Sequence, residues 1–360
     1  MKLGLLYEIQ IPKPWTPGIE QRAYREVIEQ VMLADKLGWG YVWAVEHHLL
    51  PQWSHCPAPE VLFGALSQVT KNIRIGHGIA LLPRNFNHAL RVAERAAVLD
   101  ILTGGRVELG TGRAVTLQEL DGFEVNPDDT QAMWAEAVEV LVRAWKDDYI
   151  EYKGRFYNIP KSYVVPKPVQ KPHPPMWLAG TNPETFTLAG SKGLGMLGFV
   201  TGKPEEVAPR IAKYKEAVKH AQPIADVIND QSAVLIQTYC AETHEQAVAD
   251  VTKPLDVVAQ LGAELFLPWA EKGHERKAES YKYLTQQARA GAMAGDVEQR
   301  IRDGIIAVGT PAEILKLFRT YREMGVDQML TWVQFGGLEH SKITRSMELI
   351  GKHVLPELNR

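Results

Sequence analysis

The chain has 360 residues, of which 45% are hydrophobic and 23% charged, a composition typical of folded globular proteins. Its 40 basic and 43 acidic residues leave a net charge of −3, which disfavours a nucleic-acid binder or a polybasic membrane binder. Two cysteines, Cys56 and Cys240, exclude a disulfide scaffold. There is no apolar run of about 18 residues, and Glu8 comes too early for a signal peptide, so we expect a cytoplasmic protein.

Short apolar runs alternate with longer segments of helical periodicity. The predicted strands are 2–8, 41–45, 73–82, 106–110, 176–179, 196–200, 233–240 and 329–333. The predicted helices are 19–37, 59–67, 88–102, 130–145, 183–191, 204–221, 245–260, 311–324 and 341–355. Continuous apolar runs are typical of buried parallel strands, and eight strand–helix units predict a (β/α)8 barrel. A doubly wound parallel sheet is the alternative fold.

Two stretches interrupt this alternation. Residues 146–175 combine aromatic side chains with a proline-rich run, which predicts a small hairpin followed by an extended crossing segment. Residues 263–308 begin with a short apolar patch and then become polar and irregular, so we expect a lid there. The basic side chains of this predicted lid are Lys272, His274, Lys277 and Lys282. Neither stretch indicates a domain boundary, and we predict one barrel domain over residues 1–360 with these two insertions.

Functional residues of such a barrel lie directly after the strands. Glu46, His47 and His48 follow the second predicted strand, and alternation along a strand points the two histidines to opposite sides. One of them therefore faces the barrel mouth, where a histidine near its ordinary pKa of about 6.5 suits proton transfer. A purely structural role is the alternative. A metal site is disfavoured, because there is no second histidine at helical spacing.

An anion site is predicted at the start of the helix that follows the fifth strand. Thr181 precedes this helix, Pro183 lies in its first turn and Thr185 follows closely. Exposed amides, hydroxyls and the helix dipole favour a phosphate at such a position. Arg113, after the fourth strand, can add a bidentate guanidinium. The alternative is that Thr181 or Asn182 only caps the helix and that Arg113 is an ordinary surface residue.

Several short motifs occur in a specific order along nearly the whole chain. They are Lys2-Leu3-Gly4, Trp43-Ala44-Val45-Glu46-His47-His48, Thr70-Lys71-Asn72-Ile73-Arg74-Ile75-Gly76, Leu82-Pro83, the stretch from His88 through Asp100 to Gly105-Arg106, and Val308-Gly309-Thr310-Pro311. Each motif is weak alone, but the ordered set resembles the bacterial luciferase-like, flavin-dependent monooxygenase family. The resemblance implies a luciferase-like TIM barrel that binds FMN at its mouth and assembles as a homodimer.

The resemblance also assigns roles to individual residues. Arg113 falls on the family's phosphate-binding arginine, and Thr181 and Thr185 fall in the second phosphate-binding loop. His47 falls on the catalytic histidine of luciferase, whereas His48 occupies the adjacent family position, with a structural role expected.

Four further positions are implied to lie around the flavin ring. Gly78 and Ile79 fall where relatives hold a non-prolyl cis peptide behind the ring, and Phe199 lies near a tryptophan that lines the luciferase flavin site. Gly112 stands where luciferase has a cysteine beside the reactive carbon of the flavin. We expect the missing side chain to open space at this point.

The implied enzyme is an FMN-dependent monooxygenase. A separate NAD(P)H:flavin reductase supplies reduced FMN (FMNH2), O2 forms a C4a-peroxyflavin, and a small organic substrate is oxygenated while His47 manages a proton. Two alternatives stay open: an F420-dependent hydride-transfer oxidoreductase, which needs extra basic residues at the mouth, and a non-catalytic flavin-binding subunit. Aromatic candidates for the substrate site are Tyr7, Trp15, Trp53 and Trp332.

Overall fold

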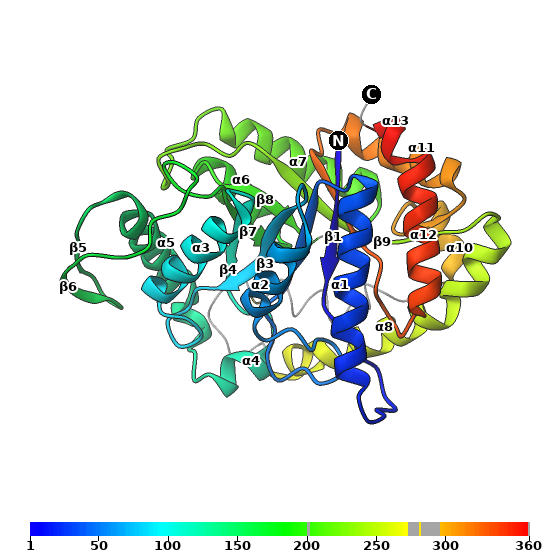
Figure 1. Ribbon diagram of the computed structural model, residues 1–360, viewed down its shortest axis with the longest axis horizontal. Helices are drawn as coiled ribbons and strands as arrows, with labels where there is room; N and C mark the ends of the chain where they lie inside the picture. The colour runs from blue at the N-terminus through cyan, green and yellow to red at the C-terminus, as the bar shows by residue number, and fades with distance from the viewer. Residues whose placement is uncertain (200–201, 273–280, 282–295, 359–360) are drawn as a thin grey trace.

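The structure is a computed structural model that describes residues 1–199, 202–272, 281 and 296–358. In this part of the chain, eight parallel strands form a closed barrel surrounded by helices (Figure 1). Around the barrel the strands are β1 (Lys2–Tyr7), β2 (Tyr41–Ala44), β3 (Arg74–Leu81), β4 (Val107–Gly112), β7 (Met176–Gly180), β8 (Gly195–Gly198), β9 (Ser232–Cys240) and β11 (Gln328–Trp332). Pairing of β11 with β1 closes the ring. The predicted (β/α)8 barrel is confirmed, and the doubly wound alternative is wrong.

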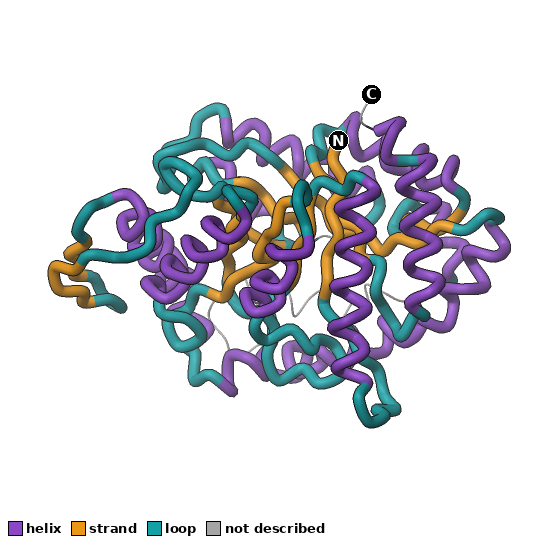
Figure 2. The backbone as a smooth tube through the Cα atoms, viewed as in Figure 1, coloured by secondary structure: helices purple, strands orange, loops and turns teal. Residues whose placement is uncertain are grey.

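Helices follow the barrel strands along the chain and lie outside them (Figure 2). They are α1 (Ile19–Leu37), α2 (Pro59–Val69), α3 (Ala89–Thr103), α4 (Leu117–Gly122), α5 (Thr130–Lys146), α6 (Pro183–Ser191), α7 (Pro204–Val218), α8 (His244–Lys272), α10 (Val297–Arg302), α11 (Pro311–Glu323), α12 (His340–His353) and α13 (Leu355–Leu358), with a 3-10 turn at Pro127–Asp129. None of the described helices is both long and apolar enough to span a membrane.

Local signals in the sequence set several helix ends. Helix α3 stops at Gly104, which has a φ of 65°, in the left-handed region that favours glycine. Helix α11 begins with a reciprocal cap, in which the Thr310 side chain accepts a hydrogen bond from the Glu313 amide and the Glu313 carboxylate accepts one from Thr310. These signals explain why the predicted helices lie close to the observed ones.

Large aromatic side chains fill the interior of the barrel. Trp43 on β2 and Trp177 on β7 are fully buried and pack edge to face, with ring centroids 5.3 Å apart. Gly76 on β3 makes room for Trp43, since a Cβ there would lie 2.3 Å from its ring. Burying each such side chain contributes on the order of 2–3 kcal/mol to folding. The packed interior leaves the mouth of the barrel as the place for a ligand.

The two predicted insertions have different outcomes. In the first, β5 (Ile150–Lys153) and β6 (Asn158–Ser162) pair antiparallel and form the expected hairpin. In the second, α8 continues to Lys272, so the prediction that this helix ends near residue 260 is wrong. The physical reason is that Leu265 extends the buried face of α8 that includes Leu261.

Two more features of the second insertion bear on the prediction. A short strand, β10 (Ala307–Gly309), pairs with the end of β9 and was not predicted. His274, Lys277 and Lys282 of the predicted lid lie outside the described residues. The lid therefore stays a prediction.

Candidate active site

A cavity of about 350 Å³ lies at the mouth of the barrel, at the carboxyl ends of the strands. This volume lies in the range of small-molecule sites, and apolar side chains supply much of the lining. Ala259, Leu265 and Phe266 of α8 form part of its wall. Seven of the eight site residues expected from the sequence line it: His47, Gly78, Ile79, Arg113, Thr181, Thr185 and Phe199.

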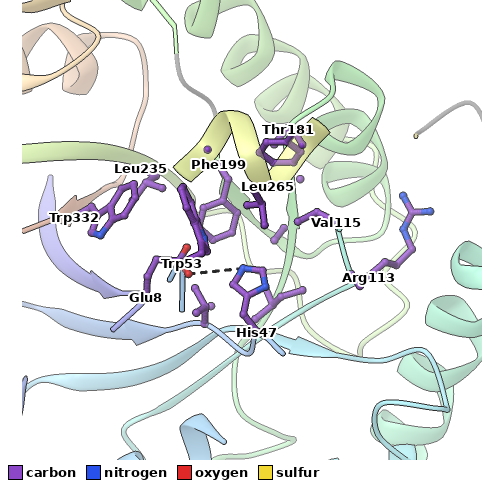
Figure 3. A pocket seen from close by; sticks show the side chains of 18 of the residues that line it. Glu8, His47, Trp53, Arg113, Val115, Thr181, Phe199, Leu235, Leu265 and Trp332 are labelled. Carbon is purple, nitrogen blue, oxygen red and sulfur yellow. Dashed lines mark ion pairs between the residues drawn. The ribbon is translucent and has the colours of Figure 1, made fainter. Parts of the chain in front are cut away.

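Two carboxylates lie beside His47 on one side of the cavity, and Figure 3 shows the ion pair with one of them, Glu8. Nδ1 of His47 lies 3.0 Å from Oε1 of Glu119, and its Nε2 lies 3.8 Å from Oε2 of Glu8. Glu119 is fully buried, and its carboxylate also accepts hydrogen bonds from the His48 amide and the Thr116 hydroxyl. Because an ionised carboxylate only accepts, Nδ1 of His47 carries a proton and Nε2 is the nitrogen directed at Glu8.

The charges of this cluster determine the protonation of His47. Burial lowers its pKa, but the carboxylates of Glu119 and Glu8 outweigh this and raise the pKa to about 9. Burial raises the pKa of Glu8 to about 7, against the opposing charge of His47. The pKa of His47 thus lies above the ordinary value of about 6.5, because the attraction of the neighbouring carboxylates outweighs the cost of burying the imidazolium. At neutral pH His47 is therefore an imidazolium, with a proton on both ring nitrogens.

His48 and Glu46 have structural partners. Nε2 of His48 lies 3.1 Å from Oε1 of Glu46, and the His48 ring packs against Phe123. Glu46 also accepts hydrogen bonds from the Leu81 amide and the Asn87 side chain. These contacts join the ends of β2 and β3, and they support the interpretation that only His47 of the pair faces the cavity.

The opposite side of the cavity is basic. Arg113 lies there, with its Nη1 3.3 Å from the Thr130 hydroxyl and its guanidinium 5.6 Å from the centre of the Tyr281 ring. The amino end of α6 is close by, because Thr181 lines the same cavity. A second guanidinium, that of Arg210 on α7, donates a hydrogen bond to the Thr181 carbonyl. We call Arg113 and the start of α6 the basic end.

Asn182 caps helix α6. Its Oδ1 accepts hydrogen bonds from both the amide and the hydroxyl of Thr185, at 2.8 and 2.7 Å. Of the two capping residues considered from the sequence, Asn182 is thus the cap and Thr181 is not. Thr185 lines the cavity, but its amide and its hydroxyl proton both donate to Asn182. Its hydroxyl oxygen can therefore only accept a hydrogen bond from a ligand.

Gly112 does not open space. A Cβ at this position would lie 2.3 Å from Cδ1 of Ile79, so the Ile79 side chain already fills the volume that a larger residue 112 would use. The expectation of a gap is wrong for this steric reason, and Gly112 lies behind the cavity wall formed by Ile79. The peptide bond between Gly78 and Ile79 is cis, as the resemblance implies.

Only two of the four aromatic candidates line the cavity. Trp53 and Trp332 form part of its wall, with ring centroids 5.7 Å apart and ring planes at 60°. Tyr7 is instead buried in the core, where its hydroxyl donates to Gln30, and Trp15 is 44% exposed on the surface. Side chains of a strand alternate between barrel interior and helix layer, which explains Tyr7.

Residues 1–328 match the luciferase-like monooxygenase family. The chain belongs to this family. The oxygenase component of flavin-dependent trigonelline monooxygenase from Acinetobacter baylyi is 26% identical over 345 residues, which cover 94% of this chain and 90% of that protein. F420-dependent glucose-6-phosphate dehydrogenase from Amycolatopsis mediterranei is 23% identical over 94% of this chain and 96% of its own length.

A solved structure shares the fold of this luciferase-like monooxygenase. It is the oxygenating constituent of 3,6-diketocamphane monooxygenase from Pseudomonas putida, in complex with FMN. The two chains superpose with a TM-score of 0.78 at 20% identity, over 99% of this chain and 98% of the other.

Sequence reasoning missed two polar residues that line the cavity of this family member, Glu8 and Gln237, and the buried Glu119 that contacts His47. Glu8 follows β1 directly, so the rule of inspecting residues after each strand would have found it. Gln237 lies within β9, and Glu119 lies on the short helix α4, which was not predicted. No local pattern marks Glu119, because its importance comes from the contact with His47, 72 residues away in the chain. We call Glu8, His47, Trp53, Gln237 and Trp332 the acidic end.

Proposed function

We propose that the chain is the oxygenase of a two-component flavin monooxygenase. It binds reduced FMN that a separate NAD(P)H:flavin reductase supplies, and it uses O2 to oxygenate a small organic substrate. Membership in the family and the flavin-dependent oxygenase component among its relatives support this proposal. The observation that carries it is one cavity with a basic end, suited to a phosphate, and a protonated histidine on the opposite side.

The residues present fit FMN. Arg113 and the amino end of α6 would hold the phosphate through a guanidinium and backbone amides. The largely apolar wall that includes Ile79 and Phe199 suits the flat ring system. When bound, reduced FMN supplies the electrons with which O2 is activated and one oxygen atom is inserted into the substrate.

In this mechanism His47 supplies a proton. Glu119 fixes the orientation of the ring through Nδ1, which directs Nε2 toward Glu8 and the cavity. Since the pKa of His47 is raised to about 9, its Nε2 is protonated at neutral pH and donates first, as a general acid. Glu8, with a pKa near 7, is placed to exchange a proton with Nε2. The wall formed by Leu265 and Phe266 restricts the access of water.

Cofactor titration tests the proposal. The purified apo chain is titrated anaerobically with FMNH2, and in parallel with FMN and F420, following absorbance and fluorescence. Tighter binding of FMNH2 than of FMN is expected, and product should form when a flavin reductase, NADH and a substrate are added. Binding of flavin without turnover of any substrate would point to a non-catalytic subunit. Absence of flavin binding would contradict the proposal.

F420-dependent hydride transfer is the second candidate. The F420-dependent relative supports it, and so does Arg210, which places a second guanidinium beside Thr181. F420 carries a longer acidic tail than FMN, and such a tail needs additional basic side chains at the mouth. Tight binding of F420, without binding of either form of FMN, would favour this candidate.

We also expect a homodimer, and sedimentation of the purified chain measures its oligomeric state.

A further inference from the structure

Two polar atoms at the acidic end lack hydrogen-bond partners within the described part of the chain. Glu8 is 7% exposed, and its Oε2 accepts no hydrogen bond there, although Nε2 of His47 lies 3.8 Å away as its ion-pair partner. Gln237 is 8% exposed, and its Nε2 donates none. Both residues line the cavity. Buried polar groups are nearly always paired in folded proteins, so these two atoms indicate the complementary groups of a ligand.

The orientation of the Gln237 amide follows from its neighbour. Nη2 of Arg300 donates a hydrogen bond of 2.8 Å to Oε1 of Gln237. Arginine carries donors only, so the amide oxygen must face Arg300 and the NH2 group is the end left over. Gln237 on β9 is also the register partner of Trp332 on β11. An unpaired donor therefore stands beside the Trp332 position.

Trp53 and Trp332 provide an aromatic corner. Both rings are at least nine-tenths buried, and their planes meet at 60°. The indole nitrogen of Trp332 already donates to the Gln334 carbonyl, at 2.8 Å. The ring face is thus what Trp332 offers to a ligand. Figure 3 places Glu8, Trp53 and Trp332 on one side of His47 and Arg113 on the other.

The acidic end, together with Glu46 and Glu119 next to it, carries an excess of negative charge. The carboxylates of Glu8, Glu46 and Glu119 all act on His47, and Glu46 also pairs with His48. The Arg300 guanidinium beside Gln237 is in turn acted on by the Asp256 carboxylate. Even a protonated His47 leaves this end negative when the acids are ionised. A cation gains from the carboxylates and from the electron-rich ring faces together, whereas an anionic group is repelled.

We propose that the acidic end binds the substrate as a flat organic cation. The positive charge lies against Glu8 and the corner of Trp53 and Trp332, and an acceptor atom of the substrate receives a hydrogen bond from Gln237. The proposed function is needed only to call this ligand a substrate. The binding chemistry itself rests on the Glu8 carboxylate, the Nε2 donor of Gln237 and the aromatic corner.

A pair of probes that differ in charge alone tests the inference. 1-Methylnicotinamide and 3-methylbenzamide have the same shape and the same carboxamide, but only the former carries a positive charge. Calorimetric titration of the full chain with each probe gives the preference for the cation. We expect the cation to bind about tenfold more tightly. Equal affinities, a preference for the neutral probe, or no binding of either at millimolar concentration would overturn the inference.

Substitutions of Glu8 and Gln237 test whether these residues cause the preference for the cationic probe. Glu8→Gln keeps the shape of the side chain and should reduce the preference to less than about threefold, whereas Gln237→Leu should weaken both probes alike. Glu216→Gln, on the exposed face of α7, is the matched control and should change neither affinity. Circular dichroism verifies that each variant is folded. A preference that survives in a folded Glu8→Gln variant would contradict the role of Glu8.

Flavin binding, measured on the same samples, separates this inference from the proposed function. A chain that prefers the cation but binds no reduced FMN upholds the binding site and overturns the monooxygenase. A chain that binds reduced FMN but shows no preference for the cation upholds the monooxygenase and overturns the substrate class.

Discussion

The basic and acidic ends of the cavity are built in different ways. The basic end uses one arginine after β4 and the start of the helix after β7, two neighbouring strands of the barrel, and Arg113, Thr181 and Thr185 are partly exposed. The acidic end brings together the residue that follows β1, side chains of β9 and β11, and the segment after β2, and most of these side chains are buried. The partly exposed basic end is suited to recognising a fixed chemical group, whereas the buried carboxylates near the acidic end shift the pKa of His47 away from its ordinary value. This division suits a cofactor at one end and chemistry at the other.

The largest effect is expected at the acidic end, from His47→Gln. The variant should lose coupled oxygenation by about 10²–10⁴-fold, because the proton donor is removed. Binding of reduced FMN should stay within about twofold, since the basic end is unchanged. Steady-state oxygenation and anaerobic titration measure the two quantities, with His220→Gln in the exposed turn after α7 as the control. Full turnover in the His47 variant would remove this residue from the mechanism.

The raised pKa of His47 predicts a pH-dependent stability. Protonated His47 stabilises the folded state fully below its unfolded pKa of about 6.5, and this contribution is lost as pH rises through about 9. The difference in free energy of unfolding between wild type and His47→Gln should therefore shrink by about 3 kcal/mol over this range. Denaturant unfolding at several pH values measures it. A difference that does not change with pH would show that the carboxylates do not raise this pKa.

At the basic end, Arg113→Ala should weaken binding of reduced FMN by about 30-fold, because a charge-assisted hydrogen bond to phosphate is lost. Riboflavin lacks the phosphate, so its affinity should be nearly unchanged. Anaerobic titration of both flavins provides the measurement, and Arg91→Ala on the exposed surface of α3 is the control. Equal losses for FMN and riboflavin would mean that Arg113 supports the fold and does not bind the phosphate.

The smallest effect concerns the wall between the two ends. Gly112→Ala should destabilise the chain by at most about 1 kcal/mol, because the added Cβ meets only Cδ1 at the end of the Ile79 side chain, which can shift. Ile79→Val removes that atom, so the double variant should regain part of the loss. Thermal unfolding of the single and double variants measures the coupling. Additive effects of the two substitutions would contradict the contact.

The prediction of fold and site from the sequence was uneven for physical reasons. The eight barrel strands were found because strands buried on both sides are continuous apolar runs. Helix α4 was missed because its six residues are too few to show a periodicity, and with it the contact of Glu119 to His47 was missed. The end of α8 was predicted too early. Which residues of the segment after 260 are buried depends on its packing against the barrel, and the sequence alone does not reveal this packing.

The sequence by itself determined the alternation of strands and helices and the position of His47 after the second strand, because both depend on residues close together in the chain. It also predicted that Arg113 and the start of α6 form one anion site, because both follow predicted barrel strands. The tertiary structure decided that Ile79 fills the space beside Gly112, that Trp53 and Trp332 meet while Tyr7 and Trp15 lie elsewhere, and that His47 is protonated at neutral pH. Steric and Coulomb interactions act over a few ångströms in space, and residues 8, 47 and 119 come within that range only when the barrel closes.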